Sequence, residues 1–179
     1  MEFQKLVQLI TEGSAVRSFA CLMLDTSFLL EDIQEDIHSY ICPCDVYDDE
    51  PGHNLELESH ITALYGIHTD KFSEVKSKVN LTSCQFKLKG LSLFKNEKYD
   101  VLKFDITSKD LHELNKQLCE SLEYTNSYPD YHPHLTVAYL KPGTGKKYTK
   151  LKSDIIGQSW TSNTYIFSDK NSNKVYHRC

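Results

Sequence analysis

Apolar residues recur along the chain with the two periods that mark secondary structure, and together they predict an α+β fold. Alternation, or a short apolar run bounded by turn residues, favours a strand. Apolar positions three or four residues apart favour a helix. Strands are expected at 19–24, 55–65, 84–94, 99–106 and 134–140, with one or two more within 155–175, and helices at 3–10, 29–41, 69–79, 107–122 and 146–151.

The helix that follows residue 106 has the clearest start signal. Thr107 is expected to cap its first turn, with Asp110 at the third helical position as in a capping box. The helix continues with apolar residues at helical spacing, which predicts one buried face. That stripe consists of Leu111, Leu114, Leu118 and Leu122.

The predicted elements form two similar units along the chain. A strand, a helix, a second strand and a helix are followed by a strand pair, a helix, a strand, a helix and a strand. No composition shift marks a linker between the units, so residues 1–179 are expected to form a single domain.

One strand in each unit carries the same short motif. His60-Ile61-Thr62 opens one apolar run and His134-Leu135-Thr136 opens the other, 74 residues later (134 − 60 = 74). Side chains at i and i+2 of a strand share a face, so each histidine projects beside its threonine. Two such strands side by side would supply a base, an acid and two neutral hydrogen-bond donors, which suits phosphodiester chemistry. A single histidine on a strand is usually structural, but the recurrence of the whole pattern favours catalysis by both.

A metal centre is the main chemical alternative. His132 and His134 are two residues apart, and so are Cys42 and Cys44, but neither pair has the spacing of a zinc finger or ribbon. No His-Glu-x-x-His motif accompanies them. We therefore expect no metal and no other cofactor. Glu58 lies two residues before His60, so on a strand it would share the face of His60 and could orient the imidazole. A solvated strand start is the competing interpretation.

Net charge and cysteine content limit the class of ligand and the cellular compartment that we expect. The net charge is −5, whereas a binder of long nucleic acid usually presents a basic face. A small anionic ligand fits better. The six cysteines include no CxxC pair and several lie in apolar patterns, which predicts free thiols and a cytoplasmic protein. No apolar stretch is long enough for a membrane span, so no membrane partner is expected.

A few further residues are candidate ligand contacts. Trp160 and Phe94 are aromatic residues in polar or loop-proximal surroundings, and an aromatic ring can stack on a base. A hydrophobic cap on the end of a sheet explains them equally well. Lys141 follows the second motif and could meet a phosphate, or could be a surface lysine in a turn. Phe19, at the start of the first strand, is included with them as a candidate.

The motifs resemble those of the two-histidine (2H) phosphoesterase superfamily, which has one His-x-Thr/Ser motif per lobe. The segments 58–66, 99–105 and 128–143 resemble its phage branch in particular, the anti-CBASS nucleases that destroy cyclic-oligonucleotide alarm signals of the host. The similarity extends over about residues 19–150. It implies a bilobal fold in which two pseudo-symmetric antiparallel sheets flank a central cleft, with helices outside.

The same resemblance implies an activity. The expected reaction is metal-independent cleavage of 3′–5′ bonds in cyclic di- and trinucleotides such as 3′,3′-cyclic GMP-AMP, by His60, Thr62, His134 and Thr136. A phage-encoded protein would do this in the host cytoplasm. Two alternatives stay open: an RNA-processing enzyme acting on 2′,3′-cyclic phosphate ends, and a sponge that holds a cyclic nucleotide without cutting it. Two complete motifs argue against the sponge, and the net charge argues mildly against the RNA enzyme.

Overall fold

We analysed a computed structural model of the protein, which describes residues 19–49, 54–125 and 130–179. The helix expected at 3–10 lies outside these ranges. The strands are β1 (Ala20–Asp25), β2 (His60–Ile67), β3 (Cys84–Lys95), β4 (Asp100–Thr107), β5 (His134–Leu140), β6 (Ser159–Ser162), β7 (Thr164–Ser168) and β8 (Lys174–Arg178). The helices are α2 (Leu30–Asp36), α3 (Phe72–Lys78) and α4 (Lys109–Ser121), with 3-10 turns η1 (Ser27–Leu29), η2 (His38–Tyr40), η3 (Pro43–Asp45) and η4 (Gly145–Lys150).

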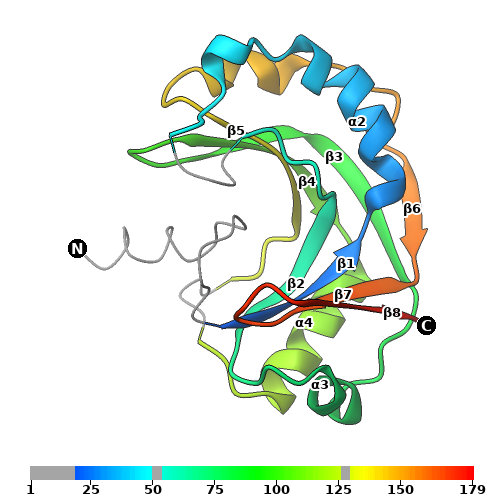
Figure 1. The fold of residues 1–179 in the computed structure, drawn as a ribbon. Coiled ribbons are helices and arrows are strands. Elements are labelled where there is room, and N and C mark those ends of the chain that lie inside the picture. The colour runs from blue at the N-terminus through cyan, green and yellow to red at the C-terminus, as the bar shows by residue number, and fades with distance from the viewer. Residues whose placement is uncertain (1–18, 50–53, 126–129) are drawn as a thin grey trace.

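All eight strands in the described ranges belong to one antiparallel sheet, in the order β6-β3-β4-β5-β2-β1-β7-β8. The sheet curls into a half-barrel with the helices outside it (Figure 1). The expectation of two separate sheets was wrong, because the two histidine strands pair with each other through Ile61 and Leu135. The pseudo-repeat survives in the strand order, since each half has four strands and its histidine strand is the innermost.

The pairing of β2 with β5 covers only this one residue pair, and side chains bind the carbonyls beyond it. Tyr131 donates its hydroxyl hydrogen bond to the Thr62 carbonyl (2.8 Å). The Asn115 amide donates to the carbonyl of Ala63 (2.7 Å). Buried backbone groups need such partners wherever a sheet ladder stops. The two strands can therefore diverge beyond this pair without leaving the two carbonyls unbonded.

The main core fills the convex side of the sheet. Ile61 and Leu135 are fully buried there, and helix α4 covers this side (Figure 1) with its predicted leucine stripe buried. The cap of α4 differs from expectation by one residue. The Ser108 hydroxyl, not that of Thr107, accepts the hydrogen bond from the Leu111 amide (3.0 Å) and also donates to the Gln85 carbonyl (2.5 Å).

Four other expected elements differ in form or extent. The helix expected at 29–41 is divided into η1, α2 and η2, and the 146–151 helix is the 3-10 turn η4. The tail forms three strands instead of one or two. Strand β2 begins only at His60, since residues 55–59 carry just an isolated bridge from Leu55 to Ala138. No helix in the described parts of the chain has the length and apolar character needed to span a bilayer.

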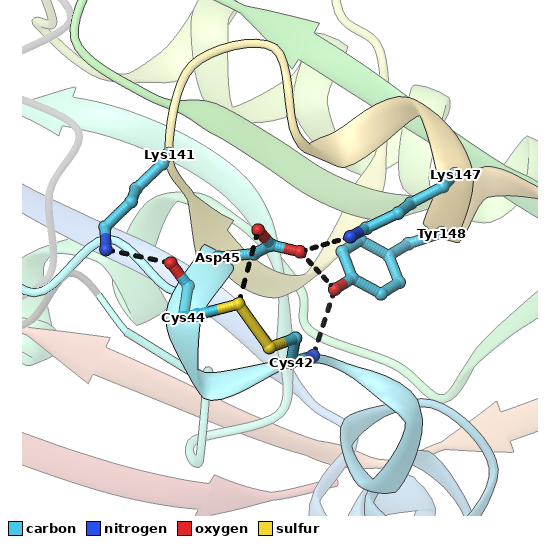
Figure 2. Close-up of a disulfide and its surroundings, with 6 residues drawn as sticks. All are labelled: Cys42, Cys44, Asp45, Lys141, Lys147 and Tyr148. Carbon is cyan, nitrogen blue, oxygen red and sulfur yellow. Dashed lines mark hydrogen bonds and ion pairs between the residues drawn. A yellow bond between two sulfur atoms is a disulfide. The ribbon is translucent and has the colours of Figure 1, made fainter.

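The segment after η2 holds a disulfide between Cys42 and Cys44, so the expectation of free thiols was wrong for these two (Figure 2). The turn at η3 brings their Cα atoms to 5.2 Å, within the range that a disulfide requires. Contacts to η4 hold the turn in place. Asp45 forms an ion pair with Lys147 (2.6 Å) and accepts from the Tyr148 hydroxyl (2.6 Å). Figure 2 shows both contacts beside the sulfur atoms.

Candidate functional site

The two histidines lie on the two central strands of the sheet, on either side of the single residue pair that joins those strands. Ile61 and Leu135 form the one pair between β2 and β5, and both face the core. Residues one position away on each strand must project to the opposite face. His60, Thr62, His134 and Thr136 therefore share the concave face around a single point of contact, as the motif spacing predicts.

Both imidazoles are held in the same way. Nδ1 of His60 is 2.5 Å from the Glu58 carbonyl oxygen, and Nδ1 of His134 is 2.9 Å from the His132 carbonyl oxygen. A carbonyl only accepts, so each Nδ1 carries the proton and donates it. In the neutral ring this leaves Nε2 as the basic nitrogen. The surroundings differ, because His60 is buried (8% exposed) and His134 is half-buried.

Each histidine has an aspartate opposite it on the outer neighbouring strand. His60 pairs with Asp25 of β1, and His134 pairs with Asp105 of β4. Directly opposed residues of an antiparallel pair project to the same face, which places a carboxylate near each imidazole. Glu58 contacts His60 through its backbone. Its carboxylate forms an ion pair with Lys174 of β8, and its backbone carbonyl is the group that holds His60.

The residues opposite the two threonines are unlike. Thr62 faces Met23, which is buried in a small apolar cluster with Cys21 and Ile166. Thr136 faces Lys103, a buried lysine. The concave surface is thus apolar beside one motif and charged beside the other. Sequence reasoning missed Lys103 and Asp105. Their signal was that two charged residues alternate with apolar residues inside a predicted strand.

Strand β5 carries a bulge just after its motif. Lys103 pairs with Thr136 while Leu102 pairs with Ala138, which leaves Val137 as the extra residue. The Val137 carbonyl accepts a hydrogen bond from His38 Nε2 (2.8 Å) of η2. It also accepts from the Glu56 amide (2.8 Å). A buried histidine and the lead-in to β2 therefore fix the bend beside Thr136.

The four candidate ligand contacts lie in different places. The Phe94 ring meets the His134 ring edge-on, with centroids 5.0 Å apart, so it belongs to the site. Phe19 stacks on His68, just beyond the opposite end of β2 (5.0 Å). Lys141 donates to the Cys44 carbonyl (2.8 Å) in the disulfide loop (Figure 2). A role of these residues in ligand binding stays a prediction.

Trp160 projects away from the histidines. It pairs with Phe86, a core residue, and its ring lies against Phe28 (5.9 Å) and the main core. Directly opposed residues share a face, so the indole is on the convex side of the sheet. The geometry does not bring it to the His-Thr pairs, and its predicted contact with ligand has no support from this position.

Metal-ligand geometry occurs elsewhere in the described chain. Cys42, Cys44 and Asp45 have donor atoms within 4.8 Å of one another, but the two sulfur atoms are bonded to each other. No cluster of three such donors includes His60 or His134 in the residues that the structure describes. The arrangement at the histidines is that of two acid–base groups and two hydroxyls.

Comparison with solved structures shows a familiar fold. E. coli LigT in its apo form has 11% sequence identity and a TM-score of 0.57, over 90% of this chain and 94% of that chain. E. coli LigT complexed with 3′-AMP has 13% identity and a TM-score of 0.56 over the same shares. A structure described as a phosphoesterase has 12% identity and a TM-score of 0.54, over 90% of this chain and 95% of the other. No curated protein matches the sequence.

A family model matches the region that contains both motifs. Residues 56–154, more than half of the chain, match the 2′-5′ RNA ligase superfamily. The match includes β2 and β5 with both His-Thr pairs, together with β3, β4 and α4. It confirms the resemblance at the level of the superfamily, whereas the phage branch stays a prediction. The chain belongs to the 2′-5′ RNA ligase superfamily of two-histidine phosphoesterases.

Proposed function

We propose that the protein is a metal-independent phosphodiesterase that cleaves 3′–5′ bonds in cyclic di- and trinucleotides. One observation carries the chemistry: both histidines face the same side beside the Ile61–Leu135 pair of β2 and β5, and each donates from Nδ1 to a carbonyl two residues earlier. The basic Nε2 of one ring can then abstract a proton, and the other ring can supply a proton when charged.

The reaction follows from those groups. One Nε2 removes the proton of a ribose 2′-hydroxyl, and the 2′-oxygen attacks the adjacent phosphorus. The bond from phosphorus to the 5′-oxygen breaks, and the second imidazole protonates that oxygen. The products are a 2′,3′-cyclic phosphate and a free 5′-hydroxyl. Water can then open the cyclic phosphate with the histidine roles exchanged, while Thr62 and Thr136 hold the non-bridging oxygens.

Two observations support a nucleotide of limited size. The Phe94 ring is 42% exposed and contacts His134, so a base could stack on it while the phosphate lies between the imidazoles. The strings at 58–66, 99–105 and 128–143 resemble the anti-CBASS branch, whose substrates are cyclic oligonucleotides. In that role the protein would protect a phage by removing the host's alarm signal.

Turnover assays test the proposal directly. The wild type should convert 3′,3′-cyclic GMP-AMP to linear products separable by chromatography, with the same rate in EDTA. His60→Ala and His134→Ala should each lower the rate by at least about 10³-fold, since each removes an acid–base group. His177→Ala is the matched control, because His177 packs on Phe72 away from the site. Full activity of either first-named variant would refute the assignment.

Substrate comparison separates the alternatives. RNA ending in a 2′,3′-cyclic phosphate should be a poor substrate if the proposal is right. Its preferential hydrolysis would instead favour the RNA-processing alternative, which the structural likeness to E. coli LigT bound to 3′-AMP makes the second candidate. Intact cyclic dinucleotide recovered from a tight complex would favour a sponge. A cyclic dinucleotide lacking the attacking 2′-hydroxyl should resist cleavage.

A further inference from the structure

A buried lysine lies beside the second motif and is not used by the mechanism above. Lys103 of β4 is 5% exposed and stands opposite Thr136 on the concave face. Lysine is rarely buried without partners, because removing an ammonium group from water is costly. The contacts of the Lys103 ammonium therefore indicate its role.

The Lys103 ammonium bridges two neighbouring strands. It donates to the Ser92 hydroxyl of β3 (2.8 Å) and forms an ion pair with the Asp105 carboxylate of its own strand. Ser92 in turn donates to the same carboxylate oxygen (2.9 Å). Burial raises the pKa of the Asp105 carboxyl, but these hydrogen bonds and the nearby charges of Lys103 and His134 outweigh it and lower the pKa below its ordinary value.

Both partners of the pair lead to His134. The Asp105 backbone pairs with that of His134, so the carboxylate and the imidazole share a face. The Lys103 ammonium is 4.2 Å from the centroid of the Phe94 ring, a cation–π contact. The Phe94 ring meets the His134 ring edge-on at 90°. The imidazole is thus flanked by a carboxylate and a ring that a single lysine holds.

The first half of the sheet differs at the equivalent position. Met23 occupies the position opposite Thr62 and is buried in an apolar cluster. Asp25, opposite His60, accepts a hydrogen bond from the Ser27 amide (2.9 Å) instead. The pseudo-symmetry therefore breaks at this charge pair, which makes the environments of the two histidines different.

We propose that Lys103 and Asp105 act as a positioning pair for His134, in which the ammonium balances the carboxylate and holds Phe94 against the imidazole. This inference rests on the proposed function, because it assigns a role at the same site. It makes the protonation of His134 depend on the charge balance between these two residues.

The charged groups that face His134 among the described residues are few. Asp105 and Lys103 come from β4, and His60 comes from β2. Lys89 lies at the β3 bulge on the far side of Asp105 and is exposed to solvent. Exposed charges are screened by water and salt, so the buried ammonium of Lys103 is the main counterion of Asp105.

An NMR titration of the His134 imidazole tests the pair without any substrate. The signal is assigned by its loss in His134→Gln, and it is then followed with pH in Lys103→Met, Asp105→Asn and the double variant. Lys103→Met leaves the carboxylate unbalanced, so the His134 midpoint should rise by about 0.5 to 1 pH unit. Asp105→Asn should move it down, and the double variant should return it close to the wild-type midpoint. Lys116→Met, an exposed lysine of α4, is the control and should leave it unchanged.

The directions of these shifts decide the outcome. A purely structural contribution would weaken the fold in both single variants without moving the midpoint in opposite directions. Unchanged midpoints, or shifts of the same sign, in folded Lys103→Met and Asp105→Asn would overturn the proposal. Lys103→Arg should keep the wild-type midpoint because it keeps the charge. Absence of turnover by the wild type would instead refute the proposed function and leave this titration readable.

Discussion

Removal of the α4 cap offers a quantitative test of how the sheet and helix are joined. Ser108 accepts a hydrogen bond from the Leu111 amide and donates one to the Gln85 carbonyl of β3. Ser108→Ala removes both. Loss of an N-cap costs about 1 kcal/mol, and loss of a hydrogen bond to a part-buried carbonyl costs about 1 kcal/mol more. We therefore expect the free energy of unfolding to fall by about 2 kcal/mol.

That loss converts to a measurable change in melting temperature. Unfolding entropy is about 2.1 cal/mol/K per residue, or about 0.38 kcal/mol/K for 179 residues. A loss of about 2 kcal/mol then lowers the melting temperature by about 5 °C. Thermal and urea denaturation followed by circular dichroism would measure both quantities.

Thr107→Ala is the matched control, since Thr107 is the cap that the sequence pattern predicts and is exposed at the end of β4. Its loss should change stability by no more than about 0.5 kcal/mol. Ser108→Thr should keep most of the stability because it keeps the hydroxyl. If Thr107→Ala proved the more damaging change, the reasoning from the observed cap would be refuted.

Two further predictions concern residues that support the site. The free energy of unfolding should fall as the pH drops below about 6.5. Burial lowers the pKa of His38, so at such pH the unfolded chain binds a proton that the folded chain does not. Urea denaturation midpoints at pH 7 and pH 5.5 would measure this loss. His38→Gln should make the stability less dependent on pH while still donating a hydrogen bond to Val137. An unchanged pH dependence in this variant would contradict the role given to His38. Tyr131→Phe removes the hydroxyl that donates to the Thr62 carbonyl, so we expect the free energy of unfolding to fall by about 1 kcal/mol and turnover to be reduced. Wild-type activity and stability in this variant would contradict the role given to the hydroxyl.

The parts of the fold that the sequence predicts are those that depend on local periodicity. The strands 84–94, 99–106 and 134–140 agree with β3, β4 and β5 to within two residues at either end. The leucine stripe of α4 is buried as expected. The pairing of His with Thr on one face also follows from the two-residue period alone, because that period is a property of every strand.

Sequence reasoning was less successful wherever a partner lies far along the chain. Two sheets were expected from the family resemblance, and nothing in either motif shows that Ile61 would pair with Leu135 and join the halves. The Cys42–Cys44 disulfide was missed because spacing gives no distance between thiols. The choice of Ser108 as the cap depends on the Gln85 carbonyl, which a local pattern does not include.

The sequence by itself determined that two His-Thr pairs exist, that each lies on a strand, and that each pair shares a face. Only the tertiary structure decided what surrounds them. A bulge shifts the register between β4 and β5 and places Lys103 opposite Thr136, while the first half has Met23 at the equivalent position. Register over such distances is set by the packing of the whole sheet, because a shift of one residue would turn every side chain to the other face.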